Sequence, residues 1–184
     1  MPSAMYFYPF NDKIIDSGII GNVSAKFALH CVAPTLGKKK FAYLWKMGAD
    51  SSTFAQYMGT MDRIYVLGHC GPGEDTLSTG IAGADFERSA TELADLFHQH
   101  GLSKVSKTHI RIHACHSGQE SAPNASDSFA EEFKKAMVTL GYKDVTIRGY
   151  KSGMGYYIIW REGECPWLSA SDANNVVQFN PPLD

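Results

Sequence analysis

The chain has 184 residues, of which 44% are hydrophobic and 20% are charged, and its formal net charge at pH 7 is −2. This size and composition predict one globular domain spanning residues 1–184, with a core of its own. The small net charge argues against a partner that is a nucleic acid or a membrane surface. The sequence has no apolar stretch of about 18 residues, so we expect no transmembrane helix. The N-terminus lacks the features of a signal peptide. Four scattered cysteines favour a reducing compartment over a disulfide framework.

The first half of the chain predicts five elements. The first sixty residues contain two strands, expected to form a hairpin at one edge of a sheet, and a short helix: 25–32, 41–45 and 52–58. Residues 64–67 are a continuous apolar run, as expected of a strand buried on both faces. Apolar residues then recur at helical spacing over 84–100, and Gly101 follows as a C-cap.

The second half continues the alternation of strands and helices. Ile110 and Ile112 alternate with polar residues, which predicts a strand at 109–113. The sequence then predicts a helix at 129–140 and two strands at 145–150 and 156–160. Beyond Pro166 the chain is polar, and we expect it to be partly loose. The order of elements predicts an α/β fold with a largely parallel central sheet.

Reactive side chains follow both strands that flank the first long helix. His69 follows the strand at 64–67, and Cys115 follows the strand at 109–113. A strand-helix-strand unit makes parallel neighbours whose C-terminal ends share one edge of the sheet, so both residues should face one crevice. A histidine can activate a cysteine thiol at neutral pH. The sequence therefore predicts a catalytic dyad, with Cys115 as nucleophile, His69 as general base and acid, and a small flexible turn after Cys115 at Ser117 and Gly118.

A strand ending in His69, Cys70 and Gly71, a helix, and a strand ending in Ala114 and Cys115 resemble the caspase-like (clan CD) cysteine peptidases. The resemblance covers about residues 64–157 and is closest to the self-processing cysteine protease domain of large bacterial RTX toxins. It departs at Cys70, because the family usually has glycine directly after the histidine. The resemblance implies a three-layer sandwich and a cysteine endopeptidase that cleaves a protein or peptide substrate, or itself. As a bacterial toxin or effector, such a protein would act in the cytoplasm or after delivery into a host cytosol.

The resemblance also implies roles for further residues. The amides of Gly71 and Cys115 would form the oxyanion hole. Arg148 would favour an acidic substrate side chain, whereas Asp75, with Glu74 and Asp85 near it, would instead favour a basic one. Inositol hexakisphosphate would be an allosteric activator, not a required cofactor, and a basic groove for it would draw on Lys104, Lys107, Lys134, Lys135, Lys143, Arg148, Lys151 and Arg161.

Other interpretations of the same residues remain open. Cys115 could be a structural cysteine, Cys70 a rival nucleophile, and Arg148 the partner of an ordinary surface carboxylate. The five clustered sulfur and imidazole groups could bind zinc, although their spacing is not that of a zinc site and we expect no metal: His69, Cys70, His113, Cys115 and His116. The whole chain could be a thiol transferase, an isopeptidase or a non-catalytic binding module with a caspase fold.

Overall fold

The computed structural model describes residues 4–11, 44–47, 58, 61–79, 87–120, 127–151 and 176–179. The elements expected at 25–32 and 156–160 lie outside these residues, as does the helix at 52–58 except for Met58. Among the described residues, no helix is long and apolar enough to cross a membrane.

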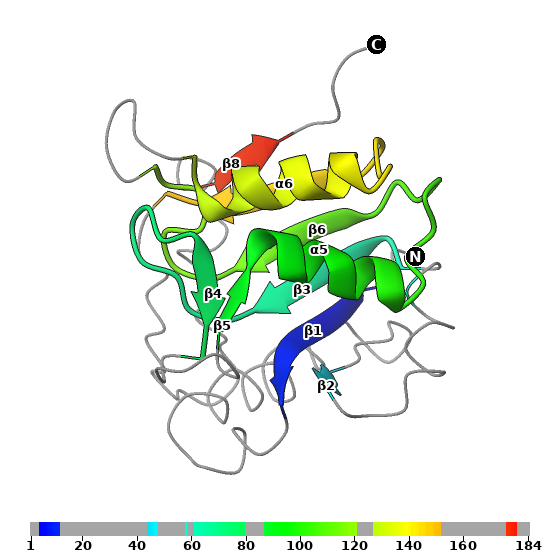
Figure 1. Ribbon diagram of the computed structural model, residues 1–184, viewed down its shortest axis with the longest axis horizontal. Helices are drawn as coiled ribbons and strands as arrows, with labels where there is room; N and C mark the ends of the chain where they lie inside the picture. The colour runs from blue at the N-terminus through cyan, green and yellow to red at the C-terminus, as the bar shows by residue number, and fades with distance from the viewer. Residues whose placement is uncertain are drawn as a thin grey trace, which may run out of the picture.

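A six-stranded sheet organises the described part of the chain, in the order β2-β1-β3-β6-β7-β8 (Figure 1). Its strands are β1 (Ala4–Asn11), β2 (Leu44–Met47), β3 (Arg63–Leu67), β6 (His109–His113), β7 (Thr146–Tyr150) and β8 (Val176–Phe179). All neighbouring pairs are parallel except β7 and β8. The predicted α/β architecture with a largely parallel sheet is thus confirmed.

Three strands differ from the prediction. β1 was not predicted, although its Phe7 and Phe10 are fully buried. β2 overlaps the expected strand at 41–45, but it pairs in parallel with β1. β8 lies in the tail that we expected to be loose, and it pairs antiparallel with β7. Val176, Val177 and Phe179 are residues that favour strands, and pairing with β7 satisfies the backbone groups of that edge.

The first long helix begins later than predicted. α5 (Ala90–Gln99) is preceded by β5 (Glu87–Ser89), which forms a small antiparallel sheet with β4 (Thr76–Ser78). The Ser89 hydroxyl accepts a hydrogen bond from the amide of Glu92 (3.2 Å), and the Glu92 carboxylate accepts one from the amide of Ser89 (2.8 Å). This capping box fixes the helix start and leaves 87–89 free to pair as a strand.

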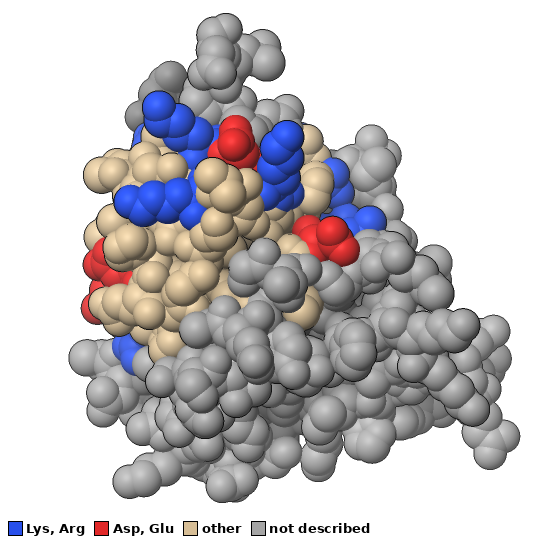
Figure 2. All heavy atoms as spheres, turned by 90° about the vertical axis from the view of Figure 1, so that its right-hand side faces the viewer, with Lys and Arg blue, Asp and Glu red and all other residues tan. Residues whose placement is uncertain are grey.

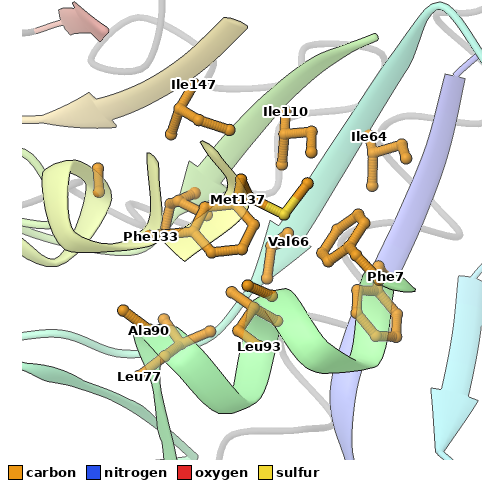
Figure 3. Packing of buried hydrophobic residues seen from close by; sticks show 14 of the residues in the cluster. Phe7, Ile64, Val66, Leu77, Ala90, Leu93, Ile110, Phe133, Met137 and Ile147 are labelled. Atoms are coloured by element: carbon orange, nitrogen blue, oxygen red, sulfur yellow. The ribbon is translucent and has the colours of Figure 1, made fainter. Parts of the chain in front are cut away.

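Both described helices cover the same face of the sheet (Figure 1). α6 (Phe129–Thr139), close to its predicted bounds, packs against α5 through the rings of Phe133 and Phe97, whose centroids are 5.6 Å apart. The sheet contributes fully buried side chains at alternate positions: Ile64, Val66, Ile110 and Ile147, which Figure 3 labels, and Ile112. Each such side chain contributes about 1.5–3 kcal/mol by leaving water. The described residues therefore form two layers, and the third layer of the expected sandwich stays a prediction.

Candidate active site

The register of β3 and β6 brings His69 and Cys115 to the same edge of the sheet. The last paired residues are Leu67 and His113, and each candidate residue lies two positions further along its own chain. Beyond the strands, the amide of Gly73 donates to the carbonyl of Gln119 (3.3 Å) and joins the two loops. The loops that follow β3 and β6 are therefore neighbours, and they form the candidate site.

Cys115 begins a tight turn with an unusual backbone conformation. His116 has φ of 54°, in the left-handed region that residues other than glycine seldom adopt. Two hydrogen bonds stabilise it: the amide of Gln119 donates to the carbonyl of His116 (2.9 Å), and His116 Nδ1 lies 2.5 Å from Gln119 Oε1. A backbone held in a sparsely populated region is often found where a functional side chain must be aimed.

Ser117 anchors this turn to three elements and corrects the expectation of a flexible segment. Its fully buried hydroxyl donates to the carbonyl of Ile112 in β6 (3.0 Å) and accepts from the amide of Tyr150 in β7 (3.2 Å). Its carbonyl accepts from the amide of Ala130 at the start of α6 (2.8 Å). The nucleophile candidate therefore leads into a fixed turn, because three separate hydrogen bonds determine the position of Ser117.

The neighbouring Gly118 lets the turn approach β7 closely. Its amide donates to the carbonyl of Tyr150 (2.9 Å). A Cβ atom on Gly149 would lie 2.7 Å from the Gly118 nitrogen, and one on Gly118 would lie 2.9 Å from the Gly149 carbonyl carbon. Both positions therefore require glycine for packing.

His69 is held by a backbone bridge to the β4–β5 hairpin. Its amide donates to the carbonyl of Ser78 (2.7 Å), and the amide of Ser78 donates to the carbonyl of His69 (2.8 Å). The preceding Gly68 allows this approach, because a Cβ atom there would lie 2.6 Å from Leu77 Cγ. The hairpin thus fixes the direction in which the chain leaves β3.

The His69 side chain is half-buried, and its Nε2 atom is buried. Within the described residues Nε2 has no hydrogen-bond partner. Burial also lowers the pKa of the His69 imidazole below its ordinary value. The ring is therefore predominantly neutral at pH 7 and can accept a proton, as a general base must.

Cys70 lies in the core beside this site. Burial first, and then the charges of Glu74, Cys115 and Asp75, raise the pKa of the Cys70 thiol to about 12. Its Sγ atom contacts the carbonyls of Gly71 (3.5 Å) and Glu74 (3.8 Å). Because the thiolate is the reactive form, this environment argues against Cys70 as the nucleophile.

The amide of Gly71, the predicted oxyanion donor, already has an acceptor. The Glu74 carboxylate accepts its hydrogen bond at 2.6 Å, and the amide of Glu74 donates to the carbonyl of Gly71 (3.2 Å). Sequence reasoning missed this contact, which depends on the conformation of a four-residue turn. A carboxylate oxygen thus occupies the position at Gly71 that an oxyanion would take.

The two predicted substrate contacts lie in different places. Asp75 is exposed in the loop after His69, near enough to raise the pKa of the Cys70 thiol. Arg148 pairs in register with Arg111, four residues before Cys115, a separation of about 13 Å along a strand. Arg148 Nε donates to Gln178 Oε1 (2.7 Å) in β8. Asp75 therefore acts on the Cys70 thiol through its charge, whereas Arg148 lies about four residues from the end of the strands that carry the candidate dyad.

Arg148 belongs to a group of guanidinium side chains on the sheet face opposite the helices. Alternate positions and register place Arg63, Arg111 and Arg148 on this face, with Tyr65 against Arg111 at 5.7 Å from its ring centroid. Burial, then the charges of Arg111 and Arg63, lower the pKa of Arg148. Its described partner is the Gln178 amide, not the surface carboxylate of the alternative interpretation.

Two of the lysines expected to form a basic groove have other partners. Lys134 is buried, and its amine donates to the carbonyl of Val145 (2.6 Å). Lys135 is paired with Asp127 and Glu132. Figure 2 shows basic side chains interspersed with acidic ones on the described surface at the end of the molecule opposite the candidate site. Activation by inositol hexakisphosphate stays a prediction.

The described residues do not gather into a metal site. No group of three or more His, Cys, Asp and Glu side chains in this part of the chain has the arrangement to hold an ion. His113 is buried between the rings of Tyr65 and Tyr150, at centroid distances of 6.3 and 5.8 Å, and His116 contacts Gln119. Two of the five side chains that the zinc interpretation requires, His113 and His116, therefore have other contacts in the structure.

Neither a protein-family model nor a curated protein matches the sequence. Functional inference therefore depends on the geometry of the two loops. Besides Cys115 and His69, the geometry identifies Ser117, Glu74 and Gly149 as residues that shape the candidate site. Only Gly149 has a clear sequence signal, because a glycine inside a strand often marks close approach of another backbone.

Proposed function

We propose that the chain is a cysteine endopeptidase with a caspase-like fold, in which Cys115 is the nucleophile and His69 carries the proton. The supporting observation is that buried His69 Nε2, without a hydrogen-bond partner among the described residues, lies at the sheet edge that bears Cys115. An unsatisfied buried polar atom costs roughly 1–3 kcal/mol. A proton-transfer role with a reacting thiol and a substrate explains why the protein bears that cost.

The proposed reaction uses the neutral imidazole as its starting state. His69 Nε2 takes the proton of Cys115 Sγ as the sulfur attacks the carbonyl carbon of the substrate. The imidazolium then protonates the leaving amine as the carbon–nitrogen bond breaks, which leaves a thioester on Cys115. A water molecule, deprotonated by His69, hydrolyses the thioester and restores the thiol.

The proposed oxyanion donors are the amides of Cys115 and Gly71. For Gly71 to donate to a substrate oxygen, the Glu74 carboxylate must leave its amide. The negative charge of Asp75, in the loop that carries His69, favours a basic substrate side chain over an acidic one, since Arg148 lies about four residues away along the strands. The substrate class proposed is therefore a peptide with lysine or arginine beside the cut.

A non-catalytic module with the same fold is the second candidate. The occupied amide of Gly71 favours it, because a decayed site no longer needs a free oxyanion donor. Glu74→Ala separates the candidates, since it removes the carboxylate from that amide and leaves His69 and Cys115 unchanged.

The test is cleavage of peptides that carry a basic, acidic or leucine side chain before the cut. Wild type should cleave the basic peptides, Cys115→Ala should be inactive, and His69→Ala should lose roughly 10²- to 10⁴-fold in rate. His109→Ala, at an exposed position at the opposite end of β6, is the matched control and should keep full activity. Equal activity in wild type and Cys115→Ala would disprove the assignment. No cleavage by wild type or Glu74→Ala would favour the binding module.

A further inference from the structure

The turn after His69 carries the Glu74 carboxylate back to the amide of Gly71. The Gly71 nitrogen lies 2.6 Å from Glu74 Oε2, and a Cβ atom added to Gly71 would lie 2.7 Å from Glu74 Oε1. The carboxylate therefore lies directly against the backbone of Gly71, in space that only glycine leaves open. A hydrogen bond to an ionised acceptor is about twice as strong as one between neutral groups. While this contact lasts, the Gly71 amide is not available to another acceptor.

The backbone of this turn is held independently of the carboxylate. The amide of Glu74 donates to the carbonyl of Gly71 (3.2 Å), and Cys70 Sγ contacts the carbonyl of Glu74 (3.8 Å). The amide of Gly73 donates to the carbonyl of Gln119 in the loop after β6 (3.3 Å). The Glu74 side chain, by contrast, is exposed to solvent. Rotation of this side chain into water would therefore free the Gly71 amide and leave the turn in place.

We propose that Glu74 is an autoinhibitory gate, whose carboxylate closes the oxyanion hole at rest by occupying the Gly71 amide. This inference rests on the proposed peptidase function, in which the Gly71 amide donates to the substrate oxygen. The carboxylate and that oxygen compete for one donor, so each turnover begins with release of the Glu74 side chain into solvent. The occupied amide is then the closed state of an active site and not a sign of its decay.

The strength of the contact sets the size of the expected effect. A hydrogen bond to a charged group typically changes an equilibrium by about 10- to 100-fold, and water competes for a carboxylate that is exposed. Removal of the Glu74 carboxylate should therefore raise the affinity for a ligand that uses the Gly71 amide by roughly tenfold. Glu74→Gln should give a smaller gain, because its neutral amide oxygen can still accept from Gly71, although more weakly.

The experiment compares a peptide aldehyde with iodoacetamide as reagents for Cys115 in the full chain. The Cys115 sulfur adds to the aldehyde carbon, and the carbonyl oxygen takes the thiol proton and lies where the oxyanion would form. Iodoacetamide alkylates the same sulfur with loss of iodide and a proton, and it places no oxygen in the oxyanion hole. We expect Glu74→Ala to bind an aldehyde that ends in arginine about tenfold more tightly than wild type, without a comparable rise in the rate of alkylation.

Glu120→Ala is the matched control, because it removes an exposed carboxylate from the loop after β6 and should keep the aldehyde affinity of wild type. Equal or weaker aldehyde binding by Glu74→Ala would overturn the gate. An equal rise in the rate of alkylation would also overturn it, because the carboxylate would then act on the thiol through its charge. No adduct on Cys115 in any variant counts against the peptidase and the gate together, whereas adducts of equal affinity in wild type and Glu74→Ala count against the gate alone.

Discussion

Replacing Ser117 by alanine should destabilise the protein by about 2 kcal/mol, because it removes a buried hydroxyl with two backbone partners. The Ser117 hydroxyl is fully buried, donates to the carbonyl of Ile112 at 3.0 Å and accepts from the amide of Tyr150 at 3.2 Å. Alanine leaves one donor and one acceptor in the interior. Each unsatisfied group costs roughly 1–3 kcal/mol, and the apolar methyl group recovers part of the loss.

The assay for Ser117→Ala is equilibrium unfolding in urea, in which a lower midpoint at an unchanged slope reports a loss of stability. Ser103→Ala is the control, because in the described structure Ser103 contributes its backbone carbonyl to a turn, at 2.9 Å from the amide of Ser106. Alkylation of Cys115 should also slow in Ser117→Ala, since the turn after the thiol loses its anchor. A destabilisation no larger than that of Ser103→Ala would refute the view that Ser117 fixes this turn.

Further predictions concern buried ionisable groups. Burial, then Arg111, lowers the pKa of His113 from 6.5 to about 4, so the unfolded chain binds the proton first as the pH falls. Stability should therefore decline as the pH falls from 6.5 to 4, with a loss of roughly 2–3 kcal/mol by pH 4.5. His113→Phe should remove this loss, and equal pH dependence of wild type and variant in urea unfolding would contradict the prediction. Lys134→Ala should cost roughly 1–3 kcal/mol, because the Val145 carbonyl loses its donor. Lys135→Ala, in an exposed ion pair, should cost about 0–1 kcal/mol; equal losses in thermal or urea unfolding would show that the Lys134 contact contributes little.

The centre of the fold could be predicted from local patterns. Ile64 to Leu67 are apolar without interruption, and Ile110 and Ile112 alternate with polar residues. Apolar residues at helical spacing lie between these two strands in the sequence. Because strands joined through a helix are usually parallel neighbours, the order and direction of β3 and β6 could be predicted. The start of α5 was misplaced because helical spacing begins before Ser89. The capping box between Ser89 and Glu92 decides the boundary, and it was not recognised in the sequence.

The edges of the sheet depend on contacts between distant parts of the chain. β1 pairs with β3 across more than fifty residues, and its Pro9 and consecutive aromatic residues do not show a regular alternation. β8 contains residues that favour strands, but it is a short segment in a polar tail, and its pairing with β7 decides that it forms a strand.

Some residues of the candidate site could also be predicted from the sequence, whereas the contacts between its loops could not. Cys115 and His69 could be named because they follow strands whose parallel pairing is predictable. The anchoring by Ser117, the occupation of the Gly71 amide by Glu74 and the burial of Cys70 depend on how the loops fold. Short turns are determined by a few hydrogen bonds between particular atoms, which residue types alone do not specify.

Selective alkylation of Cys115 tests the dyad most directly. Wild type, His69→Ala and the control His109→Ala are exposed briefly to limiting iodoacetamide at pH 6.5, and each cysteine is quantified by mass spectrometry. The account predicts rapid labelling of Cys115 and negligible labelling of buried Cys70, with the Cys115 rate reduced by roughly tenfold or more in His69→Ala alone. Equal labelling of Cys115 in wild type and His69→Ala would contradict the activation of Cys115 by His69.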